Sequence, residues 1–279
     1  MSTDLPRARL HHPGPAPEKR WAAEPCRATP VDVILPVAKT LADSVAQALE
    51  GFDGAWLVIE DAPLGNLEFV IPGNDPTGEH AAWYAGPHRM GAGHIHHLGL
   101  HAGRKDGAPW LHGHGVFSAP RWQGPTMGHI LPLESRLSQP LRAVGWGLTG
   151  AGLDVTPDPE TRFPLFQPQP RKPPGRGAAL ITLRPNQDIS QALGTAAATA
   201  GITDGRVFGL GSIVHPHLID QPPIDSYATE ILLTEGRISG GVVHLEAEIV
   251  TLTGAYHKGW LMPGGNSICI TAELLVIAD

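Results

Sequence analysis

The sequence predicts an α+β fold in which one plan, a helix followed by mainly antiparallel strands, is used twice. Three observations predict this fold. The chain has 279 residues, which are many for a single core and suit two domains of ordinary size. Its 34 Gly and 28 Pro indicate many turns and short strands rather than a helical bundle. Two segments far apart in the chain also share one order of motifs.

The first copy is expected at residues 30–155, after an arm at residues 1–29 whose prolines argue against regular structure. Apolar residues recur every fourth position from Val37 to Leu49, which predicts a helix that Gly51 ends. Apolar runs between Gly and Pro clusters then predict six strands. These are Ala55–Ile59, Leu67–Ile71, His94–Leu100, Trp110–Phe117, Gly128–Leu133 and Leu141–Leu148.

Residues 156–177 are rich in proline and predict a semi-rigid linker, with Phe163 as one anchor against the first copy or a neighbouring subunit. The second copy is expected at residues 178–279. It opens with a strand at Ala178–Leu183 and a helix at Ile189–Ala200. Four further strands are expected at Val207–Val214, Thr229–Thr234, Val242–Leu252 and Ser267–Ile277.

Two short matches support the repeat. Residues Ser44–Leu49 align with Asp188–Leu193 in the two predicted helices. Residues Gly128–Pro132 align with Gly259–Pro263 near the end of each copy. One supersecondary unit used twice therefore accounts for the length of the chain.

Charge and composition exclude some function classes. The formal net charge of −7 argues against non-specific binding of nucleic acid, which depends on Lys and Arg at phosphates. The sequence has no apolar run of about 18 residues, and its first residues lack the apolar core of a secretory signal. Cys26 and Cys269 form no paired motif, which favours free thiols. We therefore expect a cytoplasmic protein without a membrane partner.

The motif that points most directly to chemistry is His112-Gly113-His114, followed by His129. Side chains alternate along a strand, so His112 and His114 share one face, and a hairpin partner can bring His129 to them. Three neutral imidazoles with an open fourth position form a catalytic type of zinc site. The chain has 15 His, so the alternative of histidines that only form hydrogen bonds stays open.

These motifs together resemble the PPC domain, the plant and prokaryote conserved domain that also occurs in plant AT-hook proteins. The resemblance rests on the helix–strand opening, on His112–His114, on Gly128-His129-Ile130 and on Thr271–Leu274 near the end of the second copy. It covers most of the chain and implies an antiparallel sheet flanked by helices and a homo-oligomer, namely a trimer. It also implies a metal, which we expect to be zinc, on His112, His114 and His129.

The second copy departs from this pattern. The aligned motif is His244-Leu245-Glu246, and Trp260 stands where the third histidine would be. His257 lies nearby but is out of register. We therefore expect the second copy to be structural or to form a wall of the first copy's site. A metal on His244, Glu246 and His257 would refute this expectation.

Other residues are candidates for catalysis or substrate binding beside the metal. Glu134 follows His129 by five residues and is the candidate catalytic acid. Arg89 and Arg104 are candidates for binding a small carboxylated molecule by bidentate pairing, and Asp106 and His96 are further candidates for substrate binding. A solvated surface role is the alternative for each of them. The sequence leaves open whether the protein is an enzyme, for which a zinc-dependent hydrolase or lyase is the expected class.

Two other functions stay open. Residues 170–177, Pro-Arg-Lys-Pro-Pro-Gly-Arg-Gly, resemble an AT-hook, but Pro174 replaces the first arginine of its core. A DNA-associated or regulatory PPC-domain protein without enzymatic activity is thus the main alternative, while the net charge makes nucleic acid an unfavoured partner. A purely structural trimeric module is the third hypothesis.

Overall fold

Strands dominate the fold. The structure is a computed structural model and describes residues 9–279. Strands account for 57% and helices for 7%, so the predicted α+β class with flanking helices is wrong and the fold is mainly β. Two helices form where helices were expected, α1 (Leu41–Ala48) and α2 (Ile189–Thr199), but they have only 8 and 11 residues. Several strands are instead longer than the apolar runs that predicted them, because they continue through Gly and Pro.

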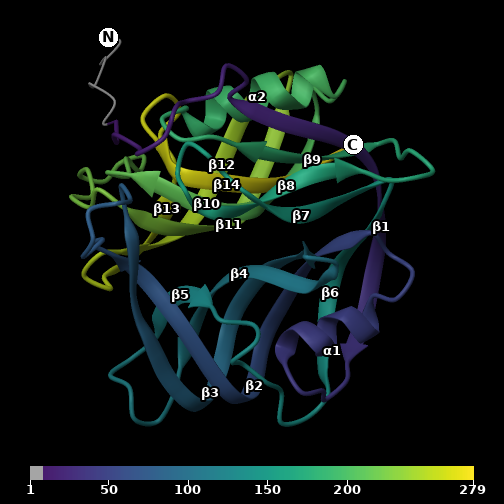
Figure 1. Cartoon of the computed structure of the whole chain (residues 1–279), viewed down its shortest axis with the longest axis vertical. Coiled ribbons are helices and arrows are strands. Elements are labelled where there is room, and N and C mark those ends of the chain that lie inside the picture. The colour runs from purple at the N-terminus through teal and green to yellow at the C-terminus, as the bar shows by residue number, and fades with distance from the viewer. Residues whose placement is uncertain (1–8) are drawn as a thin grey trace.

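The described strands hydrogen-bond into one 14-stranded sheet in the order β13-β12-β11-β10-β14-β9-β1-β6-β2-β5-β4-β3-β7-β8. Strand β1 joins the two halves of the chain, because it pairs with β9 and then with β6. The sheet folds over so that its two parts face each other (Figure 1). The strands are β1 (Trp21–Leu35), β2 (Gly54–Gly73), β3 (Trp83–Lys105), β4 (Ala108–Ser118), β5 (Thr126–Ile130), β6 (Leu141–Thr149), β7 (Ala151–Pro157), β8 (Pro164–Pro170), β9 (Ala178–Leu183), β10 (Gly205–Val214), β11 (Thr229–Ser239), β12 (Val242–Thr251), β13 (Tyr256–Trp260) and β14 (Ser267–Ala278).

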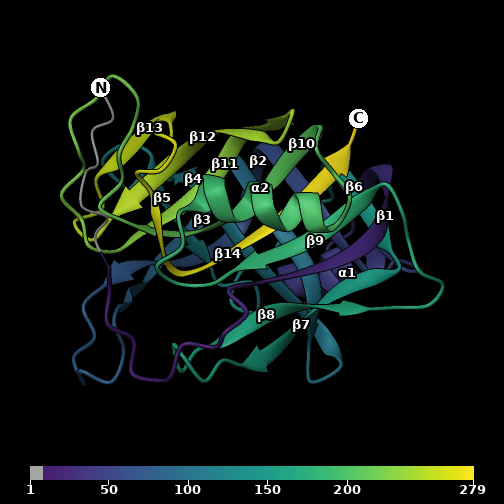
Figure 2. The same ribbon diagram turned by 90° about the horizontal axis from the view of Figure 1, so that it is seen from above.

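Three large apolar cores and one small one hold these layers together. Helix α1 buries Leu41 and Val45 against the first part of the sheet. Helix α2 buries its apolar face against the second part and lies across the outside of that part (Figure 2). The third core fills the space between the two parts, where Trp56 and Leu148 of the first half pack with Leu210 of the second. This inner core brings β4 close to β11 and β14.

The proline-rich arm is more regular than expected. Strand β1 begins at Trp21 and includes Pro25 and Pro30. Each part of β1 pairs with one neighbour only, β9 for its first part and β6 for its second. A strand that is paired on one side needs the N–H of alternate residues, so proline is accommodated between them.

The stretch expected as a linker also contains strands. Strands β7 and β8 form an antiparallel pair in which Val155 lies opposite Phe166. Phe166 is buried in the inner core and Phe163 is buried beside it, so apolar anchors fix this segment to the body. The boundaries of the arm, of the two copies and of the linker stay predictions.

Two further expectations concern the surroundings of the chain. Neither helix among the described residues has the length and apolar character that crossing a bilayer requires. Cys26 and Cys269 are both buried free thiols. Burial raises the pKa of Cys26 to about 12, so this thiol stays protonated at neutral pH.

Candidate metal centre

The three histidines of the sequence motif converge where β4 and β5 pair. His112 and His114 lie two residues apart on β4 and leave the same face of the strand. The antiparallel register places His129 of β5 directly opposite His114. The Nε2 atoms of His112 and His114 are 3.2 Å apart, and Nε2 of His114 is 3.3 Å from Nδ1 of His129. All three converging nitrogens lie within 4.8 Å of one another.

The second half of the chain holds the outer nitrogens of two of these rings. Oε2 of Glu273 on β14 lies 2.5 Å from Nδ1 of His112, and the carbonyl oxygen of Ile231 on β11 lies 2.8 Å from Nδ1 of His114. A carbonyl oxygen can only accept, so Nδ1 of His114 carries a proton and Nε2 of the neutral ring keeps its lone pair. A Glu273 carboxylate fixes the same tautomer in His112.

This arrangement fits a metal ion. Lone pairs that face each other at 3.2 Å repel unless a cation or a proton lies between them. Zinc–nitrogen bonds of about 2.0–2.1 Å at tetrahedral angles separate the ligand nitrogens by about 3.3 Å. The observed separations of 3.2 and 3.3 Å match that spacing. The residues present therefore suit zinc in donor type, in the tautomers of His112 and His114, and in two of the three nitrogen separations.

Burial keeps the rings in the neutral form that binds metals. His114 has no exposed surface, and burial, followed by the nearby His112, lowers its pKa well below the ordinary value. Burial and the same neighbours also lower the pKa of His129 well below its ordinary value. Oε2 of Glu230 on β11 lies 3.3 Å from Nε2 of His114. Burial and the nearby Glu273 raise the pKa of Glu230 well above its usual range.

A cavity of about 260 Å³ adjoins the histidines. His112, His129, Glu230 and Glu273 contribute the charged and titratable groups of its wall next to the converging nitrogens. The rest of the wall is mainly aromatic and apolar and comes from both halves of the chain. Its large members are Trp83, Tyr84, Trp110, Leu131, Phe163 and Phe166.

The other residues predicted to work at the site do not line this cavity. Glu134 is exposed, and its carbonyl oxygen accepts a hydrogen bond from Asn66. Arg89 is exposed and pairs with Glu68 at 3.4 Å. The remaining three also lie elsewhere: Arg104 and Asp106 line a separate hollow with Asp154, and exposed His96 contacts Ser118. The prediction of a carboxylated ligand rested on Arg89 and Arg104, and neither arginine lines this cavity.

The histidine and acid of the second copy do not form a comparable cluster. His244 is exposed, while Glu246 accepts a hydrogen bond from Thr234 and pairs with Lys258. Trp260, opposite Glu246 in the β12–β13 pair, is 40% exposed. Within residues 9–279, His244, Glu246 and His257 do not come together as a group that could hold a metal.

Sequence reasoning missed the roles of Glu230, Glu273 and His101. Buried His101 donates from Nε2 to the carbonyl oxygen of Glu273 at 3.0 Å, and burial lowers its pKa to about 3. It thus holds the main chain of the residue that orients His112. The signal for Glu273 was its place in an otherwise apolar strand, where a carboxylate needs a partner. Glu230 gives a similar signal at the start of the apolar run in β11.

No family model and no curated protein matches the chain. Solved structures do match. A metal-containing protein of Archaeoglobus fulgidus shares 20% identity, covering 53% of this chain and 99% of its own. A plant- and prokaryote-conserved (PPC) protein of Pyrococcus horikoshii shares 15%, covering 51% and 94%. A candidate DNA-binding protein of Ralstonia eutropha shares 16%, covering 51% and 94%. The TM-score is 0.36 in all three comparisons, and the matching structures thus include a PPC protein.

Proposed function

We propose that the protein binds a divalent metal ion, zinc, on His112, His114 and His129, and that it binds or turns over a small molecule in the adjoining cavity. One observation carries the proposal. Acceptors from the second half hold the outer nitrogens of His112 and His114, so the inner nitrogens of these two rings face each other as lone pairs at the spacing that zinc requires. Hydrogen-bonding histidines alone would not need that arrangement.

The residues of the chain would divide the work at such a centre. When bound, zinc supplies Lewis-acid chemistry to an oxygen of the small molecule. Glu273 orients His112, and the Ile231 carbonyl orients His114. Glu230 adds a carboxyl group beside the cluster, and the apolar wall limits the access of water. The first half provides the histidines and the second half provides the groups that hold them, which supports one metal site per chain.

The test is elemental analysis of protein purified without added metal and without an affinity tag. We expect about one zinc per chain in the parent and none in the double variant His112→Ala, His129→Ala. The matched control is His94→Ala, His96→Ala, which removes a half-buried and an exposed histidine with the same spacing on β3 and should keep the zinc. A well-folded parent without metal would overturn the proposal.

No specific observation among the described residues favours the DNA-associated alternative. In the basic stretch at residues 170–177, Arg171 is paired with Asp154 at 2.7 Å. Lys172 and Arg176 remain as exposed cations in a chain of net charge −7. Self-association as a trimer stays a separate proposal, which light scattering of the purified protein tests by its mass.

A further inference from the structure

The wall of the cavity beside the histidines carries information about its ligand. Flat rings form much of that wall: Trp83 and Phe163 lie stacked, with ring centroids 5.1 Å apart and an angle of 29° between the planes. Tyr84 packs edge-on against His129 at 5.3 Å, which joins the aromatic wall to the histidine cluster. Aromatic rings of a ligand pack well on such surfaces, by stacking or edge to face.

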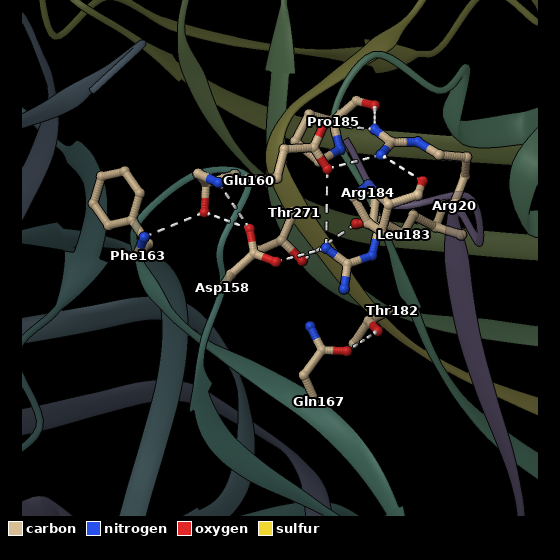
Figure 3. Close-up of polar contacts among 12 residues, drawn as sticks. Arg20, Asp158, Glu160, Phe163, Gln167, Thr182, Leu183, Arg184, Pro185 and Thr271 are labelled. Carbon is tan, nitrogen blue, oxygen red and sulfur yellow. Dashed lines mark hydrogen bonds and ion pairs between the residues drawn. The ribbon is translucent and has the colours of Figure 1, made fainter. Parts of the chain in front are cut away.

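The aromatic wall is held in place by a buried polar network. Phe163 follows a tight turn in which the carboxylate of Asp158 accepts hydrogen bonds from Thr161. Asp158 also pairs with Arg184 at 2.6 Å (Figure 3). Arg20 clamps Glu160 of the same turn through two hydrogen bonds of 2.8 Å. A wall that is fixed before binding spares the ligand the cost of ordering it. These contacts fix the turn that positions Phe163 in the wall.

The charges around the cavity select against anions. Among residues 9–279, no Lys and no Arg line the cavity, whereas Glu230 and Glu273 both do. Glu273, and Glu230 once a divalent cation beside it favours its ionised form, would balance the charge of that cation on the histidines. A carboxylate ligand would then add an unpaired negative charge inside an apolar wall, which is costly. A neutral ligand brings no such charge.

We propose that the cavity binds an uncharged, flat aromatic molecule of one or two rings that carries a hydroxyl or carbonyl oxygen. The rings lie against Trp83 and Phe163, and the oxygen points to the histidines and Glu230. The volume of about 260 Å³ is at the small end of ligand pockets, which suits a molecule of this size. The direction of the oxygen rests on the proposed metal function, whereas the packing of the rings does not.

The experiment is isothermal titration calorimetry with 2-naphthol and 2-naphthoate, which share the same rings and differ in charge. The zinc content of each sample is measured alongside. We expect the zinc-loaded parent to bind 2-naphthol at least tenfold more tightly than 2-naphthoate. Trp83→Ala should weaken binding of 2-naphthol at least tenfold and keep the zinc. The matched control is Trp260→Ala, because Trp83 and Trp260 are 37% and 40% exposed and Trp260 does not line the cavity.

The outcomes separate the two proposals. Failure of 2-naphthol to bind the zinc-loaded parent, or binding of 2-naphthoate with equal or greater affinity, overturns the ligand class. Equal losses in the Trp83 and Trp260 variants overturn the position of the rings. If the parent holds no zinc but binds 2-naphthol in a manner that requires Trp83, the metal function fails and the aromatic cavity stands.

Discussion

Replacement of Glu273 by glutamine tests the link between the two halves of the chain. The side chain is 1% exposed and its Oε2 lies 2.5 Å from Nδ1 of His112. Glutamine keeps the size of the side chain and one acceptor, so the fold should persist, but it removes the negative charge that favours the metal-binding tautomer. Loss of such an outer partner weakens metal binding about tenfold to a hundredfold, which is about 1.4 to 2.8 kcal/mol.

The assay is competition for zinc against a chromophoric chelator of known affinity. The matched control is Glu248→Gln on β12, because Glu248 is also buried and accepts a hydrogen bond from Tyr256 but lies outside the cluster. Glu248→Gln should leave the affinity for zinc within twofold of the parent. Equal zinc affinities of Glu273→Gln and the parent would show that the outer partner does not tune this site, and the reasoning would be refuted.

Three other predictions concern packing, pH and metal. A Cβ added at Gly128 would lie 2.4 Å from a ring carbon of Phe69, so Gly128→Ala should shift β5 and reduce both zinc content and melting temperature. Gly265→Ala, whose nearest atom is at 3.3 Å, should leave the zinc content unchanged and lower the melting temperature less. Burial opposes ionisation of Asp158, but hydrogen bonds from Thr161 and Arg184 outweigh it and lower the pKa of Asp158. The stabilisation from this carboxylate is therefore present above about pH 4 and is lost as the pH falls through the lowered pKa. Asp158→Asn should lower the free energy of unfolding by about 1–3 kcal/mol at pH 7 and by less at pH 3. Urea unfolding with chelator present measures both values. Zinc at a hundredfold excess over its Kd should add about 2.7 kcal/mol to the unfolding free energy, and a chelator titration that leaves the melting temperature unchanged would count against the site.

Local sequence patterns predicted the three histidines of this site but not the groups that hold their outer nitrogens. The alternation of a strand puts His112 and His114 on one face, and the hairpin brings in His129, so the cluster could be predicted from a short stretch of sequence. Glu273 is 161 residues from His112, and only the inner core between the two parts of the sheet brings them together. No periodicity or spacing encodes such a contact. Glu134 was chosen because it is near His129 in sequence, but its exposed side chain does not line the cavity beside the histidines.

The predicted fold class was wrong because local patterns do not show how strands pair with distant parts of the chain. A helix pattern at residues 37–49 and another at 189–200 were each sound, because a helix forms at both places. The lengths of the strands depend instead on pairing with distant partners. Pro25 and Pro30 argued against regular structure, yet β1 accommodates both prolines because each of its parts has one neighbour to satisfy.

Because the site is divided between the two halves of the chain, substitutions of the residues that hold the histidines differ in their effect. The histidines on β4 and β5 provide the nitrogens, whereas β11 and β14 provide the acceptors that decide which nitrogen is free. The acceptor for His114 is a main-chain carbonyl, so substitution of Ile231 leaves that contact in place as long as β11 keeps its position. The acceptor for His112 is a side chain, so a single substitution at Glu273 can change it. Variation in metal affinity should therefore arise at Glu273 more readily than at Ile231, although each of the two residues holds one ring of the same cluster.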